Sequence, residues 1–285
     1  YLKNTKGLQM SASVSFRHDI NFLRALAVTA VLLFHFGIPP FSGGFAGVDV
    51  FFVISGFLMG AIICNGLDQG KFSLVSFYIA RVKRIIPALM ALCLFCLICG
   101  WFLLAPDDYH IQALHVRDSL LFISNETYRD EAGYFDAFSH DKWLLHTWSL
   151  SVEWQFYLLL PLILWGLNKV CKTPKSLFNV LLGLTVIGFI VCFDKTNKAP
   201  ENAFFLLKYR CWEMLAGVLV FLLPKAYPAV SASLSHQKLS HYLTVLGLAL
   251  VILSTVYFNH STPWPGIYAA IPVLATTLLI LLNQQ

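Results

Sequence analysis

The sequence predicts an all-α bundle of helices that crosses a membrane several times. Of its 285 residues, 58% are hydrophobic and 12% are charged, and the mean hydropathy is +0.69, too apolar for a soluble domain of this length. Long apolar runs recur along the chain, and about 20 such residues suffice to cross the hydrocarbon core of a bilayer. The basic residues stand in short clusters between these runs, as in cytoplasmic loops, so the net charge of +5 does not indicate a nucleic-acid partner.

Eight apolar stretches qualify as spans, although the fifth and the seventh are short. In chain order they are residues 20–37, 44–64, 85–105, 143–167, 177–193, 203–223, 242–258 and 266–282. Residues 1–19 form a polar lead-in without a cleavage-site pattern, which predicts a cytoplasmic segment and not a signal peptide. Residues 1–285 therefore form one transmembrane domain. Because the sequence starts with Tyr1 and stops just past a span, we expect it to be a fragment of a longer protein.

The distribution of lysine and arginine predicts the orientation. Most basic residues fall on one side of the predicted spans, whereas acids dominate the large loop 106–142 on the other side. The basic side is expected to be the cytoplasm, and both chain ends lie there. Its members are Lys3, Lys6, Arg17, Lys71, Arg81, Lys83, Arg84, Lys169, Lys172, Lys175, Lys225 and Lys238.

The first span carries two ionisable residues, Arg24 and His35. Eleven positions separate them, close to three helical turns, so both should lie on one face about 16 Å apart along the axis. A charged side chain inside a bilayer costs roughly 2.5–3.5 kcal/mol, which favours a functional stripe facing the bundle interior. Two plainer interpretations remain: Arg24 snorkels to the headgroups, and His35 is an ordinary core histidine.

Two blocks in this region resemble a known family. Residues 23–28 read LRALAV before the FHF of 34–36, and residues 43–57 read GGFAGVDVFFVISGF, with Asp49 and Ser55 inside. They are similar to the opening spans of membrane-bound acyltransferase family 3, the O-acetyltransferases of bacterial envelope polysaccharides. Together with a final WPG at 264–266, the resemblance extends from about residue 16 to residue 280.

The resemblance implies a donor site in the basic block FYIARVKRIIPAL, residues 77–89. Family members carry a basic motif here that is interpreted as binding acyl-coenzyme A, and Arg81, Lys83 and Arg84 supply the cations that its phosphates require. Ala80 stands where an arginine is common, so the clamp is weaker or built differently. Without the resemblance, the block would be interpreted as a topology anchor against anionic headgroups.

Two later blocks also match the family. Residues 146–158, HTWSLSVEWQFYL, carry His146, Ser149 and Glu153, which make up a polar network that contacts the acceptor or supports the fold. Trp154 replaces a second carboxylate that is frequent in relatives. In the sixth span Arg210 and Glu213 are three residues apart, a spacing that favours a structural ion pair. A pair between Glu153 and Arg210 is the alternative.

The remaining features give fewer indications. Asp49 could hold the imidazole of His35 in one tautomer, as the carboxylate of a triad does, or merely cap the second span. Loop 106–142 mixes acids and aromatic rings, which suits either a sugar acceptor or a re-entrant or interfacial helix. Of the seven cysteines, three are spaced like metal ligands at 93–99 but lie within an apolar helix, so we expect neither a metal site nor disulfides.

The family implies a reaction. The protein is expected to move an acyl group, most often acetyl, from cytoplasmic acyl-CoA to a hydroxyl of an envelope glycan such as lipopolysaccharide O-antigen, capsule or peptidoglycan. It would work in the bacterial inner membrane without a bound cofactor, and an extracytoplasmic domain or partner would complete some transfers. His35, with an ordinary pKa of about 6.5, would be the general base or carry the acyl group. A transporter or flippase for a lipid-linked glycan is the alternative class.

Overall fold

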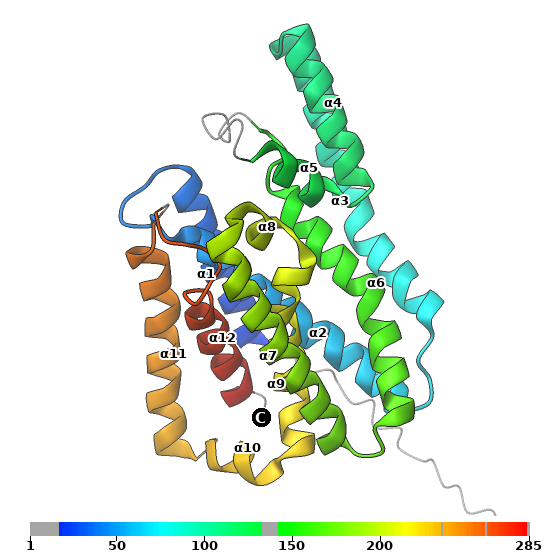
Figure 1. Cartoon of the computed structure of the whole chain (residues 1–285), viewed down its shortest axis with the longest axis vertical. Helices are drawn as coiled ribbons and strands as arrows, with labels where there is room; N and C mark the ends of the chain where they lie inside the picture. The colour runs from blue at the N-terminus through cyan, green and yellow to red at the C-terminus, as the bar shows by residue number, and fades with distance from the viewer. Residues whose placement is uncertain (1–16, 133–141, 235, 260, 284–285) are drawn as a thin grey trace, which may run out of the picture.

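A computed structural model describes residues 17–132, 142–234, 236–259 and 261–283, and confirms the all-helical class: these ranges contain helices and no strand (Figure 1). The helices are α1 His18–His35, η1 Gly44–Ala46, α2 Gly47–Asp68, α3 Leu74–Leu103, α4 Pro106–Leu120, α5 Ser124–Glu131, α6 Thr147–Val170, α7 Pro174–Lys198, α8 Pro200–Phe205, α9 Leu207–Ala226, α10 Pro228–Leu234, α11 Gln237–Tyr257 and α12 Ala270–Leu282.

Each of the eight predicted apolar stretches contains a helix, but fewer helices meet the requirements for a span. Five are long and apolar enough to cross a membrane in the described part of the chain, and a sixth is obtained if α8–α9 and α10, bent by 105°, form one broken span. Helix α12 has 13 residues and is only about 20 Å long, shorter than a hydrocarbon core. Helix α1 includes Asp19, Arg24 and two histidines, which lower its hydropathy. The structure therefore supports a multi-pass membrane protein without confirming eight spans.

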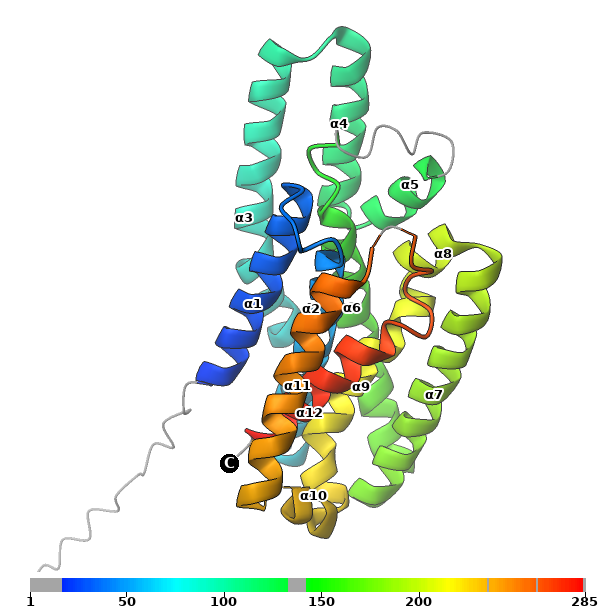
Figure 2. The ribbon, with the colours of Figure 1, turned by 90° about the vertical axis from the view of Figure 1, so that its left-hand side faces the viewer.

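Helices α2 and α9 form the centre of the bundle, with α1, α6, α7 and α12 around them (Figures 1 and 2). Their close approach depends on glycine. A Cβ atom at Gly56 would collide with the carbonyl oxygen of Met214, and one at Gly217 would collide with that of Val53. Small residues at such contacts are typical of membrane helices, because association there relies on close packing and not on expelling water.

Helices α3 and α4 form a hairpin that extends beyond the rest of the bundle (Figure 1). With 30 residues, α3 is about 45 Å long and exceeds the thickness of a hydrocarbon core. Pro106 opens α4, and Asp107 and Asp108 occupy its first turn, where carboxylates complement the helix dipole. The first part of loop 106–142 is thus helical, and both interpretations of the loop, a sugar-acceptor surface and a re-entrant or interfacial helix, stay predictions. Its aromatic residues Tyr134, Phe135 and Phe138 lie outside the described residues.

A cluster of polar contacts fastens this hairpin to α5 and to the residues before α6. Glu131 lies 2.8 Å from His115 Nε2 and 2.6 Å from Lys142 Nζ. The Ser119 and Thr147 hydroxyls are 2.7 Å apart. Burial alone would raise the pKa of Glu131, but the hydrogen bonds to His115 and Lys142 outweigh it and hold the pKa below its usual range.

Candidate active site

Glu153 on α6 is the centre of a half-buried hydrogen-bond network. The Ser55 hydroxyl of α2 donates to Glu153 Oε1 over 2.6 Å. The Tyr157 hydroxyl lies 3.1 Å from Ser55 Oγ and 3.2 Å from Glu153 Oε2. Glu153 and Tyr157 share one helix face because they are four residues apart. The network thus joins α2 to α6 through a carboxyl group held inside the bundle.

Three arginines lie close enough to this network for their charges to act on it. The charges of Arg24 on α1 and Arg84 on α3 act on Glu153, and that of Arg81 acts on the Tyr157 hydroxyl. Helices α3 and α6 run antiparallel, so one turn forward along α3 corresponds to one turn back along α6. Arg81 therefore lies near Tyr157, and Arg84, almost one turn later, lies near Glu153, about one turn earlier. A hydrogen bond of 2.8 Å from the Tyr78 hydroxyl to the carbonyl of Leu158 joins the two helices. Two of the three residues predicted to bind the donor, Arg81 and Arg84, therefore act on the same network as Arg24.

Lys83, the third predicted donor residue, lies between these two arginines in sequence but is exposed on α3. Successive residues point about 100° apart around a helix, so a side chain next to Arg84 faces elsewhere. No contact joins Lys83 to the Glu153 network in the part of the chain that the structure describes. Its predicted role stays a prediction.

The two histidines singled out from the sequence meet at one end of the bundle. His35 is the last residue of α1, and His146 directly precedes α6. Their ring centroids are 4.3 Å apart, with an interplanar angle of 83°. Both residues remain exposed, yet neighbouring protein atoms displace water from the His146 ring and lower its pKa. Neutral imidazoles suit a site that must accept a proton.

We call these groups, which belong to α1, α2, α3 and α6 and to the residue before α6, the polar stripe. Along α6, His146 and Glu153 are about 10 Å apart, and Tyr157 lies about 6 Å further on. Along α1, about 16 Å separate Arg24 from His35. The stripe therefore has a histidine end and an arginine end. It consists of His35, His146, Arg24, Glu153, Ser55, Arg84, Tyr157 and Arg81.

Asp49 lies elsewhere, which corrects its expected contact with His35. Its carboxyl oxygen is 3.1 Å from Arg210, which in turn is 3.1 Å from Glu213, and all three side chains are buried between α2 and α9. A buried carboxylate is tolerated only beside a partner charge, and α9 supplies that partner. The structure also shows Arg210 paired with Glu213, as their spacing indicates, while Glu153 has other partners.

Sequence reasoning missed Tyr157 and gave Ser55 no role. The signal for Tyr157 was present, since it follows Glu153 by four residues and so shares its face. Ser55 could be assigned only once α2 was placed against α6. Ser149 makes a local contact, its hydroxyl donating to the carbonyl of His146 over 3.2 Å.

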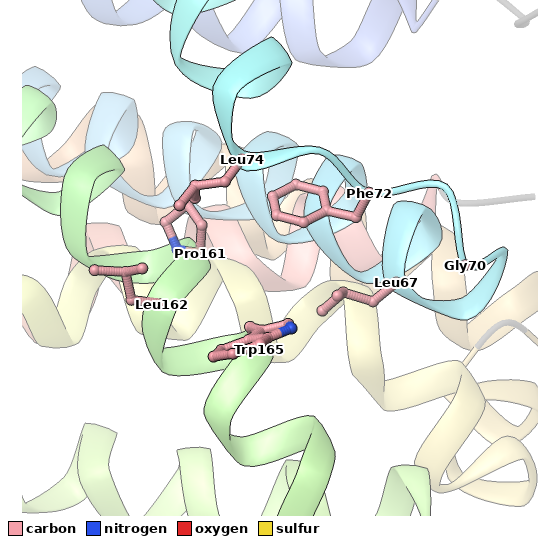
Figure 3. Close-up of a pocket in the computed structure, with 7 residues that line it drawn as sticks. All are labelled: Leu67, Gly70, Phe72, Leu74, Pro161, Leu162 and Trp165. Atoms are coloured by element: carbon pink, nitrogen blue, oxygen red, sulfur yellow. The ribbon is translucent and has the colours of Figure 1, made fainter.

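An apolar cavity of about 400 Å³ adjoins the arginine end of the stripe (Figure 3). It lies between the end of α2, the start of α3 and the second half of α6, where Pro161 follows Tyr157 by one turn. The ammonium group of Lys169 is 3.4 Å from the ring centroid of Trp165. The residues that line the cavity are Leu67, Gly70, Phe72, Leu74, Pro161, Leu162 and Trp165.

Comparisons with known proteins agree with these motifs. A Haemophilus influenzae protein of unassigned function is 31% identical over 244 residues, covering 84% of this chain and 98% of that protein. A Staphylococcus aureus protein provisionally named an O-acetyltransferase is 29% identical over 272 residues, and a Komagataeibacter xylinus protein provisionally named a membrane-bound transacylase is 31% identical over 270 residues. These matches cover 92% and 93% of this chain, but only 44% and 65% of the two relatives. No solved structure matches the chain.

The family profile for an acyltransferase domain matches residues 17–284, almost the whole chain. That range includes the polar stripe and the Asp49–Arg210–Glu213 group. The chain therefore belongs to acyltransferase family 3, and it is a membrane acyltransferase.

Proposed function

We propose that the protein transfers an acyl group, acetyl in the first instance, from cytoplasmic acyl-CoA to a hydroxyl of an envelope glycan. Lipopolysaccharide O-antigen, capsule and peptidoglycan are the acceptor classes, and the bacterial inner membrane is the proposed location. The observation that carries the proposal is the polar stripe, which has arginines at one end and a pair of histidines at the other.

The charge balance of the stripe favours an anionic substrate. Three guanidinium groups, those of Arg24, Arg81 and Arg84, act by their charge on a network that holds one carboxylate, that of Glu153. Unbalanced positive charge inside a membrane protein is costly, so an anion that enters this region is stabilised. The phosphates of acyl-CoA supply that anion, and guanidinium groups bind phosphate oxygens at two points. The cavity of Figure 3 is the adjacent recess for the apolar face of the nucleobase.

The histidine end is the proposed place of chemistry. His35 accepts the proton of the glycan hydroxyl while the hydroxyl oxygen bonds to the acyl carbon. The carbon–sulfur bond of the thioester then breaks, and the departing thiolate receives the proton from the imidazole. Contact with His146 fixes the orientation of the His35 ring, the role that we propose for this second histidine. Transient acylation of His35 is the alternative course.

Membrane vesicles test the proposal. With acetyl-CoA labelled in its acetyl group and supplied on the cytoplasmic side, label should appear in the glycan only when the protein is present. A transporter or flippase would move the glycan across the vesicle membrane without labelling it. Label-free glycan in vesicles that contain folded protein, donor and acceptor would contradict acyl transfer from acyl-CoA.

A further inference from the structure

Three ionisable side chains are enclosed at the centre of the bundle without access to water. Asp49, Arg210 and Glu213 each expose 0% of their surface. Arg210 lies 3.1 Å from each of its two carboxylate partners. The group is not part of the polar stripe, and acyl transfer as proposed above makes no use of it.

Their formal charges do not balance. One guanidinium faces two carboxylates, which would leave one net negative charge in an apolar interior. The guanidinium itself is well accommodated as a cation, because its central carbon lies 5.3 Å from the ring of Phe52, 6.0 Å from that of Trp148 and 5.8 Å from that of Phe204. The missing positive charge must therefore reside with the carboxyl groups.

The two carboxyl groups also approach each other. Asp49 and Glu213 lie within hydrogen-bonding reach of one another. None of their four oxygens has a hydrogen-bond donor of good geometry among the described residues. Ionised carboxylates only accept hydrogen bonds, so two of them in contact repel each other, whereas a proton between them turns the contact into a hydrogen bond.

We propose that Asp49 and Glu213 share one proton, so that the three-residue group is electrically neutral inside the folded protein. The proton links α2 to α9, whose backbones approach closely at Gly56 and Gly217. Helix α2 also carries Ser55, less than two turns beyond Asp49. The neutral contact between Asp49 and Glu213 therefore holds in place the Ser55 hydroxyl, which donates to Glu153. Asp49 and Glu213 are thus positioning residues for Ser55, which belongs to the polar stripe.

Among the described residues, the surroundings contain no competing proton acceptor of similar strength. The other titratable groups that act on this site are the thiols of Cys192 on α7 and Cys211 on α9. From α6 and α8, only the rings of Trp148 and Phe204 reach Arg210. Thiols ionise at higher pH than carboxyl groups, so they remain neutral while the shared proton is held.

Infrared spectroscopy of the purified protein in detergent tests for this proton directly. A protonated carboxyl group has a carbonyl stretching band apart from that of carboxylates, and the band shifts in heavy water. We expect the band in the wild type at neutral pH. Asp49→Asn and Glu213→Gln each leave a single carboxylate for Arg210, so each should lose the band. Asp118→Asn is the matched control, since the hydrogen bonds from Arg117 and Thr127 outweigh burial and hold the pKa of Asp118 below its usual range; this variant should keep the band.

Thermal unfolding provides a second measurement. If folding takes up one proton at neutral pH, the ratio of folded to unfolded protein falls about tenfold for each pH unit above the range in which unfolded carboxyl groups ionise. Glu213→Gln should lose this part of the pH dependence. A wild type without the acid band, or a band that survives in both amide variants, would overturn the proposal. If neither variant folds, the band in the wild type and its pH-dependent stability decide the question.

Discussion

His35 and His146 lie with their ring centroids 4.3 Å apart, although they belong to opposite ends of two helices distant in sequence. Each ring stands almost perpendicular to the other, so that each histidine limits the rotation of its neighbour. The contact places two imidazole rings at the same end of the polar stripe. It is the geometric basis for assigning chemistry to this end.

Replacing His35 by alanine should nearly abolish acyl transfer. Loss of a general base typically costs 10²–10⁴-fold in rate, and donor binding should change little because Arg24, Arg81 and Arg84 remain. Labelled transfer and donor affinity should be measured on the same purified protein. His241→Ala, an exposed histidine on α11, is the matched control and should retain full activity. A folded His35→Ala variant with most of its activity would exclude both chemical roles of this histidine.

Arg24→Lys should reduce transfer although it keeps the positive charge. A lysine lacks the planar fork that binds two oxygens at once, so the interaction with a donor phosphate should weaken. Steady-state kinetics with varied donor concentration would show a raised KM for acetyl-CoA. If Arg24 only snorkels to the membrane surface, lysine serves equally well and the kinetics stay unchanged.

Glutamine substitutions separate the members of the basic block. Arg81→Gln and Arg84→Gln should raise the KM for acetyl-CoA more than they lower kcat, because phosphate binding is lost. Lys83→Gln should have a smaller effect, since no contact joins Lys83 to the Glu153 network among the described residues and its side chain points about 100° away from that of Arg84. Acetyl-pantetheine, which lacks the phosphates, should respond to none of the three. Equal effects of all three substitutions would favour a general surface potential over specific contacts.

Glu131→Gln should destabilise the protein in a pH-dependent manner. The hydrogen bonds to His115 and Lys142 lower the pKa of Glu131, so its stabilising contribution is complete above the pKa of the unfolded chain, about 4.3, and disappears as the pH falls through the lower folded value. At pH 7 we expect the free energy of unfolding to fall by on the order of 1 kcal/mol, and this difference from the wild type should shrink toward zero in acid. Glu126→Gln, an exposed carboxylate paired with Arg129, is the control and should change stability little.

Cysteine labelling would establish the orientation that the basic residues predict. In a variant without the seven native cysteines, a cysteine at the exposed position 108 should react with an impermeant reagent in intact cells. One at the exposed position 172 should react only after the cells are opened. The reverse result would place the arginine end of the stripe outside, and it would remove cytoplasmic acyl-CoA as the donor.

The sequence by itself determined the helical class, the approximate position of each helix and the family. These properties are local: apolar runs of sufficient length predict helices, and residues three, four or eleven apart share a face whatever surrounds them. The spacing of Arg24 and His35, and that of Arg210 and Glu213, followed from this rule alone. The structure of loop 106–142 could not be predicted in this way, because its polar residues were compatible with several structures.

Only the tertiary structure decided which faces meet. It assigned Asp49 to Arg210 and not to His35, brought Ser55 to Glu153, and joined His35 to His146. Each of these contacts depends on the rotation and register of one helix against another, which close packing at glycines such as Gly56 fixes. Periodicity identifies the face of a helix on which a side chain lies, but it does not identify the helix opposite that face, because the opposing side chain comes from a distant part of the chain.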